Sequence, residues 1–198
     1  MIKLLVERLT DYLVNTSSIE NTDKALYEYL IEIFIQTLIN FGITMLVGLC
    51  LNMFLENMVM YITFIVLRKF TGGLHSTKYI KCLCLSVSIN LFLLIYLKYS
   101  HISAKPVIFI LMILFSVIII SFLSPIQNAN KKINRKEKYI FKTLSIVLSL
   151  CFSIISLILI KNNSRFGYPI GLAIITVSIL VLFGKFINKN DEDMFNKY

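Results

Sequence analysis

The chain has 198 residues, of which 57% are hydrophobic and 16% are charged, and its mean hydropathy is +0.78. Soluble domains are roughly 45–50% apolar and about 25% charged, so this composition excludes an ordinary soluble protein and indicates a membrane protein. The net charge of +9 does not indicate nucleic-acid binding, because Lys and Arg gather in the short connections between apolar runs, where they set membrane topology.

The first 32 residues are predicted to form a helical part outside the membrane core. The stretch "MIKLLVERLTDYLVN" combines charged residues with apolar residues that recur at helical spacing. It lacks the small-residue cleavage site of a signal peptide. Amphipathic helices of this kind lie on the membrane surface or against other helices. We expect the surface position, on the cytoplasmic side.

Six apolar segments follow, and a helix needs about 17–25 mostly apolar residues to cross the hydrocarbon. The second segment has only eleven residues before Arg68. It crosses either where the bilayer is locally thinner or with Arg68 and Lys69 below the hydrocarbon surface. The predicted segments are 33–55, 57–67, 82–97, 107–123, 144–160 and 168–187, and a cytoplasmic tail occupies 188–198.

The distribution of Lys and Arg supports this count. With both termini in the cytoplasm, sixteen of these residues fall inside, and four fall outside (Lys98, Lys105, Lys161 and Arg165). Cytoplasmic loops are enriched in Lys and Arg, so an even number of crossings is favoured. Without the second crossing, the six Lys and Arg residues of 124–143 would lie outside.

The sequence therefore predicts an all-α fold. We expect a polytopic helical bundle in the cytoplasmic membrane, with six transmembrane segments, the second of them short, and an N-terminal amphipathic interfacial helix. The whole chain, 1–198, is expected to form one membrane domain, with 1–32 as the amphipathic cytoplasmic part and 33–187 as the membrane part.

Four cysteines stand at positions 50, 82, 84 and 151, without a repeated CxxC motif. We expect reduced thiols that pack as small hydrophobic side chains. Cys82 and Cys84 are too close in sequence to clamp zinc on their own, and the chain has only two histidines. Neither a metal nor a cofactor is expected.

The stretch "RKFTGGLHSTKYIKCLC" (68–84) separates two apolar runs and holds one of the two histidines. In an unbroken helix His75 and Cys82 would share a face but lie roughly 10 Å apart along the axis. A general base must approach its nucleophile to about 3 Å. Gly72 and Gly73 permit a sharp turn, because glycine adopts conformations that other residues avoid. His75 would then be free to bend toward Cys82.

A cysteine–histidine pair has specific chemistry. The thiolate is the nucleophile, and an adjacent imidazolium lowers the thiol pKa toward neutral pH. A new helix starting near Ser76 or Thr77, both suitable N-caps, would complete the turn. Cys84 is a poorer candidate, since it points about 200° away from Cys82 on a helix. The alternative interpretation is an interfacial His75 and a Cys82 that only packs, and the spacing alone does not decide between them.

The string Arg68–x3–Gly72–Gly73–x–His75–x6–Cys82 resembles the signature of the accessory gene regulator B (AgrB) family of membrane peptidases. The chain length, the amino-terminal helix and the six apolar segments agree with that family. A basic cytoplasmic loop that opens with proline, "SPIQNANKKINRKEKYIFK", agrees as well.

The resemblance implies a cysteine endopeptidase of a Gram-positive bacterium. Such enzymes cut the C-terminal tail from an AgrD-like precursor peptide through an acyl-enzyme and promote cyclisation to a thiolactone or lactone for quorum sensing. Carried over by position, Cys82 would be the nucleophile and His75 the general base, with Arg68, Gly72 and Gly73 as supporting motif positions. The resemblance also implies a homodimer.

Other roles stay open at this point. A third catalytic member could be Glu28, Glu32, Glu56 or Asn90, whereas His101 on the predicted outer loop should be dispensable. Arg68 could clamp a peptide carboxylate or extend to the lipid headgroups. The basic residues of the 124–143 loop could bind an acidic precursor tail, although they also fix topology. They include Lys131, Lys132, Arg135 and Lys136.

Two competing classes remain. A non-enzymatic small transporter or peptide exporter would use the short second segment to line a path, but the strongly apolar segments contain almost no charge. A thiol redox protein would use Cys82 and Cys84, but their one-residue spacing strains any disulfide.

Overall fold

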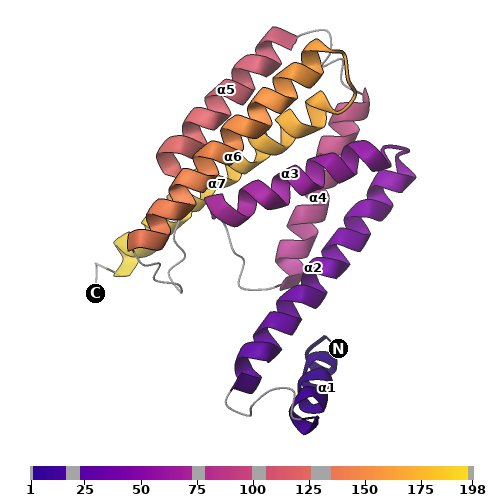
Figure 1. Ribbon diagram of the computed structural model, residues 1–198, viewed down its shortest axis with the longest axis vertical. Coiled ribbons are helices and arrows are strands. Elements are labelled where there is room, and N and C mark those ends of the chain that lie inside the picture. Colours follow the sequence, from indigo (N-terminus) through magenta and orange to yellow (C-terminus); the bar gives the residue numbers. More distant parts are fainter. Residues whose placement is uncertain (1, 17–22, 73–78, 100–105, 126–134, 196–198) are drawn as a thin grey trace.

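The computed structural model describes residues 2–16, 23–72, 79–99, 106–125 and 135–195. Within these residues all regular structure is helical and no strand occurs (Figure 1), so the expected all-α fold is confirmed. The helices are α1 (Ile2–Asn15), α2 (Lys24–Cys50), α3 (Phe54–Thr71), α4 (Tyr79–Tyr99), α5 (Pro106–Leu123), α6 (Arg135–Lys161) and α7 (Gly167–Phe195).

Each of the six expected apolar segments corresponds to one helix, in order from α2 to α7. In the described part of the chain four helices are long and apolar enough to cross a membrane: α2, α5, α6 from Glu137, and α7 as far as Phe186. These long apolar helices make the chain a membrane protein. The apolar part of α4, Leu83–Tyr99, is shorter, and α3 carries charged residues at both ends. Six crossings therefore stay a prediction.

The first two of these helices differ in their bounds from the expected apolar segments. The first segment was expected over 33–55, but α2 runs over Lys24–Cys50. The second was expected as eleven residues, but α3 has 18, a length of about 27 Å. The charged ends of α3 explain the difference in length. Glu56 in the first turn and Arg68 and Lys69 in the last suit the helix dipole, whereas hydropathy excludes them.

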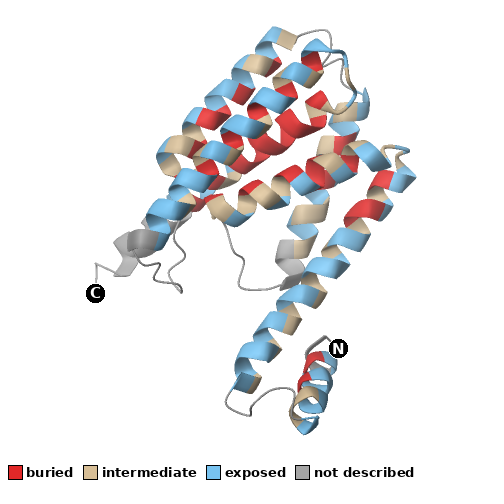
Figure 2. Ribbon diagram, in the orientation of Figure 1, coloured by how far each residue is buried: buried red, intermediate tan, exposed pale blue. Residues whose placement is uncertain are grey.

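Helix α7 is the centre of the bundle. It packs against α3, α5 and α6, and Figure 2 shows buried residues along much of its membrane part. Ile174, Val177 and Val181 are fully buried there. Gly171 allows α5 to come close, because a Cβ at this position would lie 2.6 Å from Phe109 Cε1.

Small polar residues hold α6 against its neighbours. Ser145, Ser149, Ser153 and Ser156 are all buried on one face of α6. The Ser124 hydroxyl donates to Ser145 Oγ at 3.0 Å, and the Ser156 hydroxyl donates to the carbonyl oxygen at the start of α7 at 2.8 Å. Lipid tails are as apolar as leucine, so close approach of small residues and interhelical hydrogen bonds stabilise such contacts.

Three contacts define the two ends of the bundle. Lys98 Nζ donates to the carbonyl oxygen of Leu51 at 3.0 Å, and Arg165 Nε lies 3.5 Å from Glu56 Oε1. These contacts gather the α2–α3 turn, the end of α4 and the α6–α7 turn at what we call the turn end. The rings of Phe70 and Phe141, 6.2 Å apart, join the end of α3 to the start of α6 at what we call the motif end.

Candidate active site

The chain turns sharply where α3 ends. Thr71 is the last helical residue, and Gly72 follows with φ 69° and ψ −157°. This region of backbone conformation is essentially restricted to glycine. The Gly72 N–H donates to the carbonyl oxygen of Arg68 at 3.2 Å and closes the last turn. An unbroken helix from 68 to 82 is therefore absent, as the glycine pair predicted.

The predicted nucleophile lies just beyond this turn. Cys82 is the fourth residue of α4, which is described from Tyr79 onward. Gly73, His75 and the helix start expected near Ser76 or Thr77 fall outside the described residues, as does the side chain of Cys82. The pairing of His75 with Cys82 therefore stays a prediction.

Arg68 stands on the last turn of α3 with its side chain partly inside the protein. The residue is half-buried, and its Nη1 atom is buried. Leu67 and Thr71 beside it are fully buried. The neighbouring Lys69 is exposed, with its ammonium 5.9 Å from the Phe70 ring. Arg68 is thus the cation of this pair that the fold encloses.

The basic start of α6 reaches the same end of the molecule. Arg135 and Lys136 are the first two residues of α6, about 9 Å before Phe141 along the helix. The ring contact between Phe70 and Phe141 brings α3 and α6 together there. Lys131, Lys132 and the side chains of Arg135 and Lys136 lie outside the described residues.

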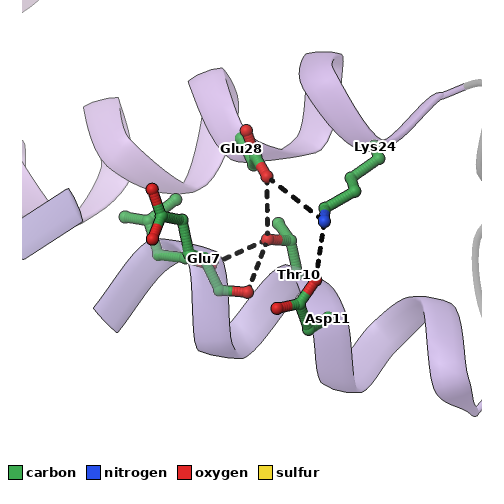
Figure 3. Close-up of polar contacts among 6 residues, drawn as sticks. Glu7, Thr10, Asp11, Lys24 and Glu28 are labelled. Carbon is green, nitrogen blue, oxygen red and sulfur yellow. Dashed lines mark hydrogen bonds and ion pairs between the residues drawn. The ribbon is translucent and has the colours of Figure 1, made fainter. Parts of the chain in front are cut away.

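Helix α1 packs on the first turns of α2, as Figure 3 shows. Lys24 Nζ lies 2.6 Å from Asp11 Oδ1 and 3.9 Å from Glu28 Oε1. The Thr10 hydroxyl lies 3.4 Å from Glu28 Oε1. Glu28, one candidate for a third catalytic member, is therefore engaged in the α1–α2 contact.

The rest of α1 keeps an exposed apolar face. Leu5, Leu9 and Tyr12 are exposed, while Val6 is buried and faces α2 together with Thr10. Helix α1 therefore contacts another helix, which was the less favoured of the two expected arrangements. Its exposed face also suits a membrane surface, and that position stays a prediction.

The remaining candidates for a third member have other partners. Glu32 accepts a hydrogen bond from Gln36 at 3.0 Å, and Glu56 lies at the turn end. Asn90 is eight residues after Cys82 on α4, about 12 Å along the axis. It is too far along the helix to touch a reacting group at Cys82. Nothing in the sequence favoured one of these residues, and in the structure each of them makes another contact.

The other three cysteines are free thiols, as expected, but they are not packed against other helices. Cys50, Cys84 and Cys151 are all exposed. Exposed positions on apolar helices face lipid, where a thiol is as acceptable as a small hydrophobic side chain. No group of three potential metal ligands occurs among the residues that the structure describes. His101 lies outside those residues.

Comparison with known proteins gives a consistent result. The sequence profile described as "Accessory gene regulator B" matches residues 6–183. "Putative AgrB-like protein 2" of Clostridium perfringens strain 13 is 28% identical over 185 residues, covering 87% of this chain and 84% of the relative. "Putative AgrB-like protein" of strain SM101 is 27% identical over 173 residues, covering 82% of this chain and 80% of the relative. No solved structure matches.

Proposed function

Because this chain belongs to the accessory gene regulator B family of processing proteins, we propose that it is a membrane cysteine endopeptidase. Its substrate is an AgrD-like precursor peptide, from which it removes the C-terminal tail. The observation that carries this proposal is the glycine turn at Gly72. It interrupts the helix between Arg68 and Cys82, as a base that must fold back toward its nucleophile requires.

In the first step the Cys82 thiolate attacks the carbonyl carbon of the scissile peptide bond. The carbon–nitrogen bond breaks, and the leaving amine takes a proton from the His75 imidazolium. The tail is released, and the rest of the precursor is held as a thioester on Cys82. This division of labour between nucleophile and base follows the general logic of covalent catalysis.

The position of Cys82 on α4 favours a reactive thiolate. It lies toward the N-terminal end of α4, and backbone N–H groups and the helix dipole at that end of a helix favour negative charge. The same N–H groups can stabilise the oxyanion of the tetrahedral intermediate. Lys69, exposed at the end of α3, adds positive potential at the motif end.

In the second step the precursor's own cysteine or serine attacks the thioester. A new sulfur–carbon or oxygen–carbon bond closes the ring, the Cys82 thiolate leaves, and the nucleophile's proton passes to His75. Exchange of one thioester for another is nearly neutral in free energy, so water must be kept from the acyl-enzyme. A site at the membrane edge helps to exclude it.

We assign recognition of the precursor to positively charged side chains at the motif end. Arg68 is partly enclosed there, and Arg135 and Lys136 begin the helix that touches Phe70. A guanidinium binds a carboxylate through two parallel hydrogen bonds, so Arg68 suits one acidic group of the precursor. Lys131 and Lys132, just before α6 in sequence, are assigned to the acidic tail.

Single substitutions test the proposal. Membranes containing Cys82→Ala or His75→Ala should not cleave the precursor although the protein inserts normally. Cys84→Ser and His101→Ala are matched controls and should cleave at the parent rate. Cleavage by Cys82→Ala together with loss of cleavage in Cys84→Ser would assign the nucleophile to the wrong cysteine. Cleavage by all four variants would leave peptide export as the better account.

A further inference from the structure

The helix that carries the proposed nucleophile has few contacts with the rest of the described structure. Helix α4 packs mainly against α2, with a smaller contact to α7. Among its described side chains only Asn90 and Leu94 are buried, whereas Cys84, Leu85 and Phe92 are exposed. Apolar contacts alone define the rotation of such a helix poorly, because lipid offers an equally apolar neighbour.

Hydrogen bonds between side-chain amides supply a contact that depends on the rotation of α4. The Asn90 Nδ2 group donates to Asn57 Oδ1 at 2.9 Å, and Asn57 Nδ2 donates to the carbonyl oxygen of Thr44 at 2.7 Å. Asn57 has no exposed surface, and Asn90 is 9% exposed. These two bonds join α4 to α3 and α3 to α2 inside the bundle.

Gly48 makes room for this chain of amides. A Cβ at Gly48 would lie 2.6 Å from Asn57 Nδ2 and 2.9 Å from Asn57 Cβ. Any larger residue would push α3 away from α2 and move Asn57 from its place. The site for the Asn57 amide is therefore formed by the backbone of α2, and it leaves Asn57 Oδ1 directed to α4.

From this geometry we infer that Asn57 and Asn90 are positioning residues that set the rotation of α4 and thereby the direction of Cys82. The inference rests on the proposed function of Cys82. Eight residues separate positions 82 and 90, which is about 12 Å along the axis and about 80° in rotation beyond two full turns. The amides act through the rigid helix and do not reach the reacting atoms.

Small rotations matter at this distance from the chemistry. Misplacement of a reacting group by about 1 Å can lower a rate by about 100-fold. The hydrogen bond between the two amides needs a particular rotation of α4, because the donor and the acceptor must face each other. Lys98, which donates to Leu51 at the turn end, limits sliding of α4 but lies far from position 82.

Asn90→Leu is the decisive variant because its effects on stability and on rate should differ. The Asn90 Oδ1 atom is buried and accepts no hydrogen bond within the described part of the chain. Leucine removes this unsatisfied acceptor but leaves Asn57 Oδ1 unsatisfied in its place. The two changes oppose each other, so the thermal stability in detergent should change little. The rate of precursor cleavage at saturating precursor should fall about 10- to 100-fold, with precursor binding unchanged.

A conservative variant and a matched control accompany the Asn90→Leu experiment. Asn90→Gln keeps an amide donor and should restore at least part of the rate. Ser156→Ala removes a buried hydrogen bond of similar length at the turn end and should cleave at the parent rate. If Asn90→Leu does not insert, Asn90→Ala is used with the same criteria. Cleavage within about twofold of the parent, or an equal loss in Ser156→Ala, would overturn the inference.

A second arm does not need peptidase activity. Single-cysteine proteins are prepared with the thiol at position 84, which is exposed, or at position 87, which is half-buried. A membrane-permeant maleimide should alkylate a thiol at position 84 faster than one at position 87. Asn90→Leu should reduce this difference in alkylation rate. If Cys82 proves not to be the nucleophile, the difference in alkylation rate still tests the rotation of α4. A contrast that Asn90→Leu leaves unchanged would overturn the inference even where the peptidase assignment holds.

Discussion

Gly72 is the residue on which the geometry of the proposed site depends most. Its φ of 69° and ψ of −157° lie in a region where a side chain costs of order 1–3 kcal/mol. The turn that it makes ends α3 directly after the half-buried Arg68 and the buried Thr71. The position of the motif therefore depends on the absence of a Cβ at one residue.

Gly72→Ala should lower the rate of precursor cleavage by about tenfold or more, because about 1.4 kcal/mol of strain corresponds to a factor of ten. The measurement is cleavage by membranes that contain equal amounts of each variant. Gly42→Ala is the control, since a Cβ there meets nothing within 4 Å and alanine favours a helix interior. Full activity in Gly72→Ala would show that the turn does not set the geometry of the site.

At the scale of elements, α3 shows what the sequence could predict and what it could not. The apolar run 57–67 predicted its existence, and the glycine pair predicted its end. Hydropathy did not predict its full length, because Glu56 and Lys69 are charged yet belong to its terminal turns. Pairing between distant residues, such as Asn57 with Asn90, depends on helix packing, which periodicity in a single chain does not encode.

The candidate site was predictable to a similar degree. The order of Arg68, the glycine pair and Cys82 indicated a turn before a new helix, and the described part of that turn agrees. Asn90 was named from the sequence only as one candidate for a third catalytic member, and nothing in the sequence indicated a role for Asn57. A lone asparagine at the start of an apolar run is typical of a helix end, and the hydrogen bonds of Asn57 with Thr44 and Asn90 explain its burial.

The packing of α5 on α7 gives a prediction at the same scale. Gly171→Ala should lower the free energy of unfolding by about 1–3 kcal/mol, a typical cost of overpacking. The new Cβ would lie 2.6 Å from the ring of Phe109, which also packs against Tyr168 at a centroid distance of 5.2 Å and so cannot move freely. Thermal unfolding in detergent measures the change.

A second substitution separates crowding from other causes. Phe109→Leu shortens the side chain that the new Cβ meets, so the double variant should recover part of the stability that Gly171→Ala loses. Equal stability of the parent and of Gly171→Ala would mean that α5 and α7 are not in close contact at this glycine.

At the scale of the whole molecule, the contacts at the two ends fit helices that alternate in direction from α2 to α7. Glu56 with Arg165 and Lys98 with Leu51 gather at one end, and Phe70 with Phe141 lies at the other. This alternation is what six consecutive crossings require. The cytoplasmic position of the motif end follows from the distribution of Lys and Arg and is a prediction, as is the homodimer.

Labelling of single cysteines tests the orientation. In a variant with the native cysteines replaced, Asn163→Cys at the turn end should react with a membrane-impermeant maleimide in intact cells. Lys138→Cys near the start of α6 should react only after the membrane is permeabilised. Both residues are exposed, so each thiol is accessible from its own side. If Lys138→Cys reacts in intact cells and Asn163→Cys does not, the motif end lies outside the cell, where it cannot meet a precursor in the cytoplasm.

The role of Cys82 as the nucleophile is tested most directly by mass spectrometry of the protein after brief incubation with precursor and rapid acid quenching. If Cys82 is the nucleophile, the protein should carry an adduct equal in mass to the precursor without its tail. The adduct should map to the peptide that contains Cys82, be released by hydroxylamine as a thioester is, and be absent from Cys82→Ala. Tail release without any such adduct, or an adduct that maps to another cysteine, would contradict the assignment of Cys82 as the nucleophile.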